Sequence, residues 1–490
     1  MIWTKEKRYR RIDEASQEEL LKLRSDVSGC QWRQTYHIQP VTGLLNDPNG
    51  FSYFNGEYHL FYQWFPLGPV HGLKYWYHTK SKDLVQWENV GIGIEPTNEY
   101  DSHGAYSGSA IEHGGKLYLL YTGNTRDENW VRHPYQCLAV MDPSGEIAKL
   151  EQPVIREVPN GYTDHFRDPK VWKDGDVFYA MIGAQRENET GCVVLYRSED
   201  LRNWEFVGEI NTDLENFGYM WECPDYFTLQ DKGVLIFSPQ GIEPKEDQFH
   251  NIYQSGYVLG EKLAIDQLTL VHGSFRELDR GFDFYAPQTM IDPDGRRILV
   301  GWMGLPEIEY PTDKNGWAHC LTLPRELSIN EGKLMQRPVK ELETLRGQSS
   351  EVKAVLNNEK KEYVGFSGTA YELIAEFSEF DAVEFGIEFR AGDEEKTVVY
   401  YDAVQKNVIL DRSYSGAAVA EDYGTVRKCA LDDAPKIKLH VFVDVSSIEM
   451  FINDGKEVFT SRIFPSSDSD GIRFFAAGGK AHLHAEKWDY

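Results

Sequence analysis

Positive charge is scarce in this chain. Its 490 residues include 51 Lys and Arg against 78 Asp and Glu, which gives a formal net charge of −27. Nucleic acids and anionic membranes are bound through basic patches, so this balance argues against both as partners. It does not exclude a few clustered cations that bind a single phosphate group.

Long apolar runs are also missing. No uninterrupted apolar stretch approaches the roughly 20 residues needed to cross a bilayer. The residues from Met1 to Arg8 become charged at once and lack the apolar core of a signal peptide. The sequence therefore predicts a soluble, cytoplasmic protein.

Cysteines are few and scattered. None of the six forms a C-x-x-C pair, a pattern typical of reduced thiols rather than of a disulfide framework or zinc site. They stand at Cys30, Cys137, Cys192, Cys223, Cys320 and Cys429. No set of His, Asp and Glu has the spacing of a metal site either, so we expect no cofactor and no catalytic metal.

The length of the chain favours two domains, because 490 residues exceed one ordinary hydrophobic core. Residues 13–27 place leucines among acids and lysines at helical spacing, which predicts one amphipathic helix in an N-terminal appendage, residues 1–32. After Trp32 the chain changes to short aromatic and β-branched runs separated by glycines. This pattern of short strand-like runs is typical of an all-β protein.

A repeat of about 60 residues runs through the next part of the chain. A glycine followed by a strand-like run recurs at Gly56, Gly115, Gly175, Gly233 and Gly295, at intervals of 59, 60, 58 and 62 residues. The pattern S-x-D-L-x-x-W occurs at Ser81–Trp87 and again 117 residues later at Ser198–Trp204. Tandem sandwiches of ~100 residues would need a longer unit. The repeat therefore predicts a five-bladed β-propeller over residues 33–337.

The repeat stops near Leu323–Leu327. Residues 338–349 contain a short helical pattern that begins with a proline, and we interpret them as a linker. From residue 350 apolar and polar residues alternate, as in Ile437–Val443, which predicts a β-sandwich over residues 350–490. This part lacks paired acids, so no chemistry is assigned to it.

A polar segment precedes each repeated glycine. These segments are Asn46–Pro48, Tyr106–Ser109, Arg167–Pro169, Glu222–Asp225 and Tyr285–Gln288. Equivalent positions of a propeller lie on a ring around its axis. If the first strand of each unit is innermost, Asp47, Asp168 and Glu222 converge at one mouth of the channel.

Convergent carboxylates are the usual means of cleaving a glycosidic bond. Glu222 stands between Trp221 and Cys223, apolar surroundings that would favour a protonated acid. Asp47 lies in a polar turn that favours the ionised form. Asp168 follows Arg167, whose charge would keep that carboxylate ionised.

Three of the segments resemble the signature motifs of glycoside hydrolase family 32, which comprises invertases, fructanases and sucrose-6-phosphate hydrolases. They are Leu45–Gly50, Phe166–Pro169 and Trp221–Pro224. The resemblance continues, in order, through Phe61–Trp64, Tyr106–Ala110, Tyr121–Asn124, Asp283–Ala286 and Leu323–Leu327. The fold of that family, a five-bladed propeller followed by a sandwich, agrees with the repeats.

The resemblance implies Asp47 as nucleophile, Glu222 as acid/base and Asp168 as transition-state stabiliser, with retention of configuration. It further implies a fructosyl pocket lined by Asn46, Gln63, Trp64, Ser107, Arg167 and Tyr285. Leu45 stands where many members have Trp or Met, and Tyr77 where many have Gly. Neither change affects an acid, so we expect an altered pocket shape.

Within the family the chain most resembles cytoplasmic sucrose-6-phosphate hydrolases, which implies sucrose 6-phosphate, and sucrose itself, as substrates. A phosphate needs cations, and Arg126, Arg132 and His133 form a basic segment in this acidic chain. That these are solvated loop charges stays an open alternative. So do a fructan exo-hydrolase, an inverting furanosidase and a non-catalytic sugar-binding propeller. The oligomeric state is left open.

Overall fold

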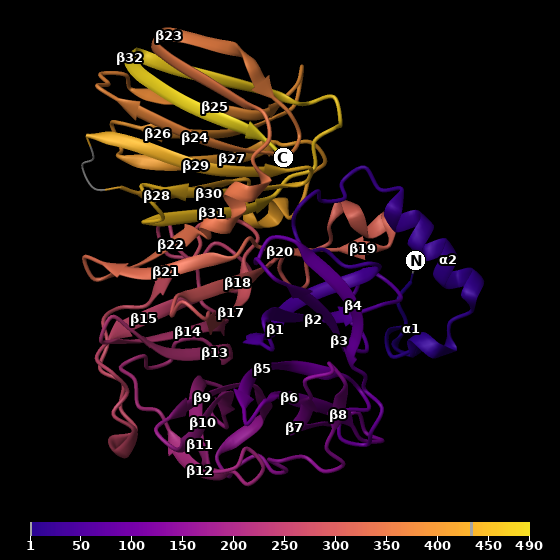
Figure 1. The fold of residues 1–490 in the computed structure, drawn as a ribbon. Coiled ribbons are helices and arrows are strands. Elements are labelled where there is room, and N and C mark those ends of the chain that lie inside the picture. Colours follow the sequence, from indigo (N-terminus) through magenta and orange to yellow (C-terminus); the bar gives the residue numbers. More distant parts are fainter. Residues whose placement is uncertain (1, 432–434) are drawn as a thin grey trace.

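The computed structural model describes residues 2–431 and 435–490. Strands dominate it, and Figure 1 shows a propeller in indigo to salmon below a sandwich in orange and yellow. The helices α1 (Lys5–Arg8) and α2 (Gln17–Ser28) lie beside the first blade. The all-β prediction, a five-bladed propeller followed by a sandwich, is confirmed.

Each blade is an antiparallel sheet built from consecutive strands. The first has β1 (Gly43–Phe54), β2 (Glu57–Phe65), β3 (Tyr75–Ser81) and β4 (Trp87–Ile94); the second β5 (Ala105–His113), β6 (Lys116–Arg126), β7 (Arg132–Met141) and β8 (Ile147–Lys149); the third β9 (Tyr162–Asp174), β10 (Val177–Arg186), β11 (Gly191–Ser198) and β12 (Glu205–Glu209). The fourth has β13 (Met220–Leu229), β14 (Lys232–Gln240), β15 (Gly256–Gly260) and β16 (Arg276–Glu277), and the fifth β17 (Tyr285–Ile291), β18 (Arg297–Met303), β21 (Arg325–Asn330) and β22 (Lys333–Pro338). The hairpin turns use left-handed residues such as Gly56, with φ of 84°.

The first strands of the blades line the propeller axis. β1 contacts β5, β5 contacts β9, β9 contacts β13, β13 contacts β17, and β17 contacts β1. The ring is tied together by β19 (Trp317–Ala318), which pairs in parallel with β1, while β20 (Cys320–Leu321) pairs with β18. The polar segments identified in the sequence therefore lie on the innermost strands.

The sandwich follows a 3₁₀ turn, η4 (Lys340–Leu345). Its strands are β23 (Ser349–Ser367), β24 (Tyr371–Ser378), β25 (Glu384–Ala391), β26 (Lys396–Asp402), β27 (Asn407–Tyr414), β28 (Val426–Ala430), β29 (Lys436–Asp444), β30 (Ser447–Ile452), β31 (Glu457–Arg462) and β32 (Gly471–Asp489). The first half of β32 pairs with β25 and its second half with β24, so this long strand belongs to both layers.

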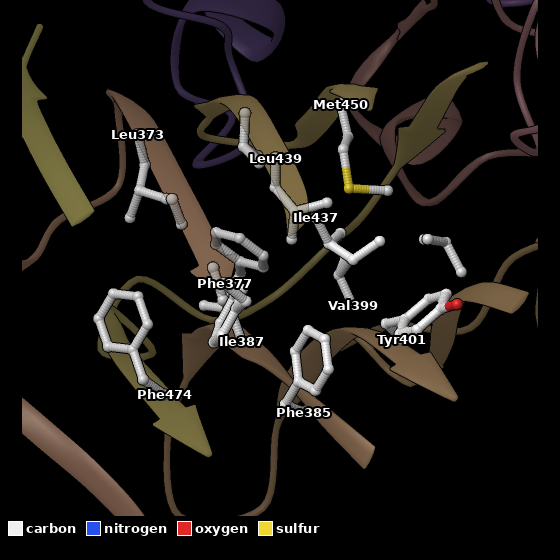
Figure 2. Close-up of a cluster of buried hydrophobic side chains, with 14 of the residues drawn as sticks. Leu373, Phe377, Phe385, Ile387, Val399, Tyr401, Ile437, Leu439, Met450 and Phe474 are labelled. Carbon is white, nitrogen blue, oxygen red and sulfur yellow. The ribbon is translucent and has the colours of Figure 1, made fainter. Parts of the chain in front are cut away.

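Apolar side chains fill the space between the two layers. Figure 2 shows Leu373 and Phe377 of β24 facing Phe385 and Ile387 of β25, with Phe474 of β32 at the side. All five are nearly inaccessible to solvent. Burying a side chain of this size stabilises a fold by about 1.5–3 kcal/mol.

A buried charge network joins the sandwich to the propeller. Arg325 of β21 donates hydrogen bonds to Asp279 (3.0 Å) and to Glu449 of β30 (2.6 Å). His37 lies between Asp444 (2.8 Å) and Glu449 (3.0 Å). Burial lowers the pKa of His37, but the two carboxylates outweigh it and raise that pKa to about 9.

The N-terminal segment packs on the propeller and on the junction. α2 begins at Gln17 because the Ser16 side chain caps it, so the predicted helix of residues 13–27 is confirmed with a shorter start. Its Val27 packs with Trp317 and Phe464. The carbonyl of Arg8 accepts a hydrogen bond from the backbone of Leu73 (2.7 Å). Among the described residues no helix is long and apolar enough to cross a membrane.

Candidate active site

Every innermost strand carries a β-bulge at its polar segment. The register shifts between Leu45 and Pro48, Ala105 and Gly108, Arg167 and Lys170, Glu222 and Asp225, and Tyr285 and Gln288. Asp168, Cys223 and Ala286 take left-handed φ values of 66°, 49° and 46°. Non-glycine residues in this region are uncommon and concentrate at functional sites. The bulges turn these side chains toward the axis.

Aligning the polar segments on Pro48, Gly108, Pro169, Pro224 and Pro287 defines two successive positions of the propeller, which we call the outer and inner rings. The outer ring contains Asn46, Tyr106, Arg167, Glu222 and Tyr285, and the inner ring Asp47, Ser107, Asp168, Cys223 and Ala286. Glu222 is therefore one position away from the two aspartates, although the repeat placed all three acids at equivalent positions. The reason is that Pro224 aligns with Pro48 and Pro169, so that Cys223 takes the aspartate position.

Hydrogen bonds surround Asp47. Its Oδ1 accepts from the Asn46 amide (3.1 Å), and its Oδ2 accepts from the Ser107 hydroxyl. Gln63 joins these two partners, accepting from Asn46 (2.9 Å) and donating to Ser107 (2.6 Å). Burial nevertheless raises the pKa of Asp47 above its usual range, against the effect of Ser107. The predicted polar turn is instead part of the buried strand β1.

Asp168 is buried beside Cys223. Its Oδ2 accepts the backbone N–H of Cys223 (3.1 Å), whose Sγ lies 3.6 Å from Oδ2 of Asp47. Burial raises the pKa of Asp168 to about 7, and the nearby charge of Glu222 adds to the increase. The charge of Arg167, 3.9 Å away, opposes this shift without cancelling it. The expectation that the charge of Arg167 would keep Asp168 ionised is therefore wrong.

Glu222 receives four hydrogen bonds. Nε and Nη2 of Arg167 donate to its Oε1 (2.9 and 2.7 Å), while Gln240 (2.9 Å) and the Tyr285 hydroxyl (2.7 Å) donate to Oε2. The predicted apolar surroundings are wrong, because neighbouring strand residues face opposite sides. Trp221 points into the blade, where its ring stacks on Phe237 at 4.3 Å.

Trp64 is not brought to the acids. It follows Gln63 on β2, so it faces the opposite side of the strand. Its indole donates to the Thr42 carbonyl (2.6 Å), and its ring packs edge-on against Tyr77 at 4.9 Å. Gln63, Asn46, Ser107, Arg167 and Tyr285 do lie around the acids.

Arg126 and Arg132 lie opposite each other on β6 and β7, so their side chains share one face. Arg126 donates to the Trp130 carbonyl (3.1 Å), and Arg132 lies over the ring of Tyr106, 5.9 Å from its centroid. Burial lowers the pKa of Arg132. The charge of Arg167 lowers it further, and the charge of Glu222 opposes this. Within the described part of the chain, Nε of each arginine is buried without a hydrogen-bond partner.

His133 lies on the other face of β7 and pairs with Asp127 (3.4 Å). The structure therefore separates His133 from the arginine pair. The N-terminal segment lies near that pair instead. Tyr9 packs its ring against Trp130 (5.2 Å) and His103 (5.5 Å). The charges of Arg126 and Arg132 lower the pKa of its hydroxyl, against the effect of burial.

A polar layer closes the channel beneath the acids. Lys170 pairs with Asp225 at 2.9 Å, and Gln288 donates to the Gly108 carbonyl (2.9 Å). A cavity of about 10 Å³ lies between this layer and Asp168, enough for one water molecule. The space on this side of the acids is too small for a sugar.

Two residues at this site escaped the sequence reasoning. Gln240 ends the otherwise mostly apolar strand β14 and reaches Glu222 from there. Lys74 is buried and donates to Oδ1 of Asn46 (2.6 Å). The sequence did offer a signal for each: Gln240 is a polar residue at the end of a mostly apolar run, and Lys74 is a charged residue between Leu73 and Tyr75.

Potential metal ligands gather elsewhere. Within residues 2–431 and 435–490, one group of His and acids lies close enough together to hold an ion: Glu351, His484 and Glu486 on the surface of the sandwich. Lys353 already pairs with Glu351 at 2.6 Å. All six cysteines are free thiols.

Residues 37–338 match the Glycosyl hydrolases family 32 N-terminal domain, and residues 341–489 match the Glycosyl hydrolases family 32 C terminal domain. The chain belongs to glycosyl hydrolase family 32. It is thereby a glycoside hydrolase, as the motifs around Asp47, Asp168 and Glu222 predicted.

Similar proteins extend over the full length of this family 32 chain. A curated sucrose-6-phosphate hydrolase of Staphylococcus xylosus is 49% identical, with 99% of this chain and 98% of that protein covered. The solved sucrose-6-phosphate hydrolase of Lactobacillus gasseri is 39% identical with a TM-score of 0.94, covering 100% and 99%. A Bombyx mori GH32 β-fructofuranosidase mutant in complex with sucrose is 35% identical, TM-score 0.82, with 98% of each chain covered.

Proposed function

We propose that this protein hydrolyses sucrose 6-phosphate to glucose 6-phosphate and fructose with retention of configuration at the fructosyl carbon. The supporting observation is the meeting of Asp47, Asp168 and Glu222 around Cys223 at one end of the channel, each with different partners. The 49% identical relative with the same printed activity points the same way.

Asp47 is the nucleophile of this proposal. Ser107 and Asn46 hold its two oxygens, which leaves the carboxylate with one fixed orientation. An oxygen of Asp47 bonds to the anomeric carbon of the fructosyl unit while the bond from that carbon to the glucosyl oxygen breaks. Asp168 lies beside it and would hold substrate hydroxyls through the positively charged transition state.

Glu222 is the acid and then the base. It donates its proton to the departing glucosyl oxygen, and later accepts a proton from the water that displaces Asp47 from the anomeric carbon. Arg167, Gln240 and Tyr285 hold the carboxyl in place through both steps. The bulge that offsets Glu222 from the aspartates puts it on the side of the leaving group in this proposal.

Arg126 and Arg132 are the proposed phosphate site. They share a face beside Tyr106, whose neighbour Ser107 contacts Asp47. Both side chains are partly exposed, and a guanidinium binds phosphate through several N–H groups. We further propose that the enzyme acts in the cytoplasm, because a phosphorylated disaccharide does not cross a bilayer unaided.

The deciding experiment measures fructose release from sucrose 6-phosphate, sucrose and 1-kestose, giving kcat/KM for each. We expect at least a tenfold preference for the phosphorylated sugar, about 1.4 kcal/mol of discrimination. Equal values for both sucroses would reassign the enzyme as a general invertase, and faster turnover of 1-kestose as a fructan hydrolase. NMR of the first anomer formed tests retention, and no turnover at all would contradict catalysis.

A further inference from the structure

Lys74 is a buried cation next to the candidate nucleophile. It stands in the connection between β2 and β3, just before β3, and 3% of the residue is exposed to solvent. Nζ donates to Oδ1 of Asn46 at 2.6 Å, and the Lys74 carbonyl accepts from the backbone of Ala105 at the start of β5 (2.9 Å). The lysine is thus fixed at both its backbone and its side chain.

Among the described residues, no ion pair accounts for the charge of Lys74. Lys170, another buried lysine of the propeller, pairs directly with Asp225 at 2.9 Å. Lys74 instead contacts a neutral amide. Burial lowers its pKa to about 7, and the charge of Asp47 acts in the opposite direction, so Lys74 is an ammonium below that pH. A buried cation held against an amide requires another explanation.

The explanation lies in the direction of the hydrogen bonds. An ammonium has donors only, so it can accept no bond from Asn46. Oδ1 of Asn46 must therefore face Lys74, and Nδ2 must face Asp47 and Gln63. Turning the amide over would place Nδ2 against the ammonium and an oxygen against the carboxylate.

The orientation of Asn46 then determines the rest of the ring around Asp47. Gln63 accepts from Asn46 through Oε1, so its Nε2 must donate to Ser107 (2.6 Å). With that N–H occupying the Ser107 oxygen, the serine hydroxyl proton points to Oδ2 of Asp47. Both oxygens of Asp47 thus accept a hydrogen bond, one from Asn46 and one from Ser107, and the contact of Lys74 with Asn46 determines the orientation of both donors.

We propose that Lys74 is a positioning residue: it orients the hydrogen bonds of Asn46, Gln63 and Ser107 so that all of them stabilise the ionised, attacking form of Asp47. This inference rests on the proposed role of Asp47 as nucleophile. Because Lys74 acts through Asn46, it affects the rate of attack more than substrate binding.

The other charged neighbours do not compete for this function. His71 and His319 lie near Lys74, and burial lowers the pKa of both well below the usual value, with Lys74 adding to the effect. Both imidazoles are therefore neutral at pH 7. Arg8 acts on His71 and donates to its carbonyl (3.2 Å). Asp47 is the negative charge that faces the ammonium.

The test is a double-mutant cycle in the full-length enzyme. Lys74→Met keeps the length of the side chain but removes its donor, and Asn46→Ala removes the amide through which it acts. We expect Lys74→Met to lower kcat on sucrose 6-phosphate by roughly 10- to 100-fold with KM within about threefold. If Lys74 acts through Asn46, the double variant is no slower than the slower single variant. Losses that multiply would overturn the proposal.

Two further measurements exclude a merely structural role. Lys74→Gln retains a donor for Asn46, so it should recover activity over Lys74→Met, which loss of core packing would not produce. The acid limb of the pH profile of kcat/KM reports the ionisation of Asp47 and should move to higher pH in Lys74→Met. The reason is that Lys74, Asn46 and Ser107 lower the pKa of Asp47, whereas burial and Glu222 raise it. An unmoved limb with no recovery in Lys74→Gln would contradict the inference.

Lys80→Met on β3 is the matched control, since Lys80 pairs with Glu57 (3.2 Å) away from the acids. Its kinetics should equal those of the unmodified enzyme. The two proposals fail differently. An unmodified enzyme that releases no fructose contradicts the proposed function, whereas an active enzyme with multiplying losses contradicts only the role of Lys74. If Lys74→Met does not fold, Lys74→Leu, which also removes the donor, completes the same cycle with Asn46→Ala.

Discussion

Arg167 binds Glu222 of the next blade rather than its own neighbour Asp168. Its Nε and Nη2 lie 2.9 and 2.7 Å from Oε1 of Glu222, while its Nε lies 3.9 Å from Asp168. Both residues belong to the outer ring, with Tyr285 on the far side of Glu222. The acid is therefore held from both adjacent blades, and its orientation depends on the propeller being closed.

Glu222→Gln should lower kcat on sucrose 6-phosphate by roughly 10²- to 10⁴-fold, the usual contribution of a general acid. Gln keeps the shape of the side chain, and its one amide oxygen can still accept from Arg167. The sharper measurement uses fructosyl fluoride, whose leaving group needs no proton. With fructosyl fluoride, Glu222→Gln should form the fructosyl-enzyme nearly as fast as the unmodified enzyme. An equal loss of rate on sucrose 6-phosphate and on fructosyl fluoride would contradict the role of Glu222 as general acid.

Asp47→Ala should abolish turnover almost completely, on the order of 10⁴-fold or more, because no other group can form the covalent intermediate. Azide can enter the space left by the carboxylate and attack the fructosyl carbon directly. We expect azide to restore turnover of fructosyl fluoride and to give a product of inverted configuration. The same addition to Glu222→Gln serves as control, and restored turnover with retention would rule Asp47 out as nucleophile.

Arg126→Gln and Arg132→Gln should each lower kcat/KM for sucrose 6-phosphate by roughly 10- to 100-fold, since a hydrogen bond to a charged group contributes about 1.5–3 kcal/mol. Turnover of plain sucrose should stay within about twofold. His133→Gln is the matched control, because His133 lies on the same strand but on the other face. Unchanged preference in both arginine variants would place the phosphate elsewhere.

Asp168 should make the fold less stable as the pH rises. Its folded-state pKa of about 7 exceeds the ordinary value of 3.8, so the folded protein binds more protons than the unfolded chain between these two values. Stability contributed by this group is therefore lost as pH increases through that window. Asp168→Asn should raise Tm at pH 8 by on the order of a few degrees and have little effect near pH 4, while activity falls steeply. A lower Tm at pH 8 would contradict the burial argument.

His37 should act in the opposite sense. Its pKa of about 9 in the folded state exceeds the unfolded value of 6.5, so its contribution is complete below pH 6.5 and is lost as the pH rises through 9. His37→Gln should lower Tm at pH 6 by on the order of 5 °C or more, because it leaves Asp444 and Glu449 buried with fewer partners. Differential scanning calorimetry from pH 6 to 10 should show the difference shrinking, and a constant difference would contradict the charge argument.

Much of the architecture followed from periodicity in the sequence. The spacing of the repeated glycines predicted five blades, and the polar segments before them predicted which parts of the innermost strands meet. These features are local or strictly repeated, so each unit shows the same signal. The motifs around Asp47, Asp168 and Glu222 placed the chain in its family for the same reason.

The environment of each acid was decided by the tertiary structure. Arg167 and its partner Glu222 are 55 residues apart in the sequence, and Cys223 and Asp47 are 176 residues apart. Lys74 contacts Asn46 of β1 from the connection between β2 and β3. Burial raised the pKa of both aspartates, although their neighbours in sequence are polar or basic. Local sequence thus determined where the strands and bulges form. The protonation of the acids depends on what the closed ring of blades brings beside them and on how much water it excludes, and neither quantity is a property of a short segment.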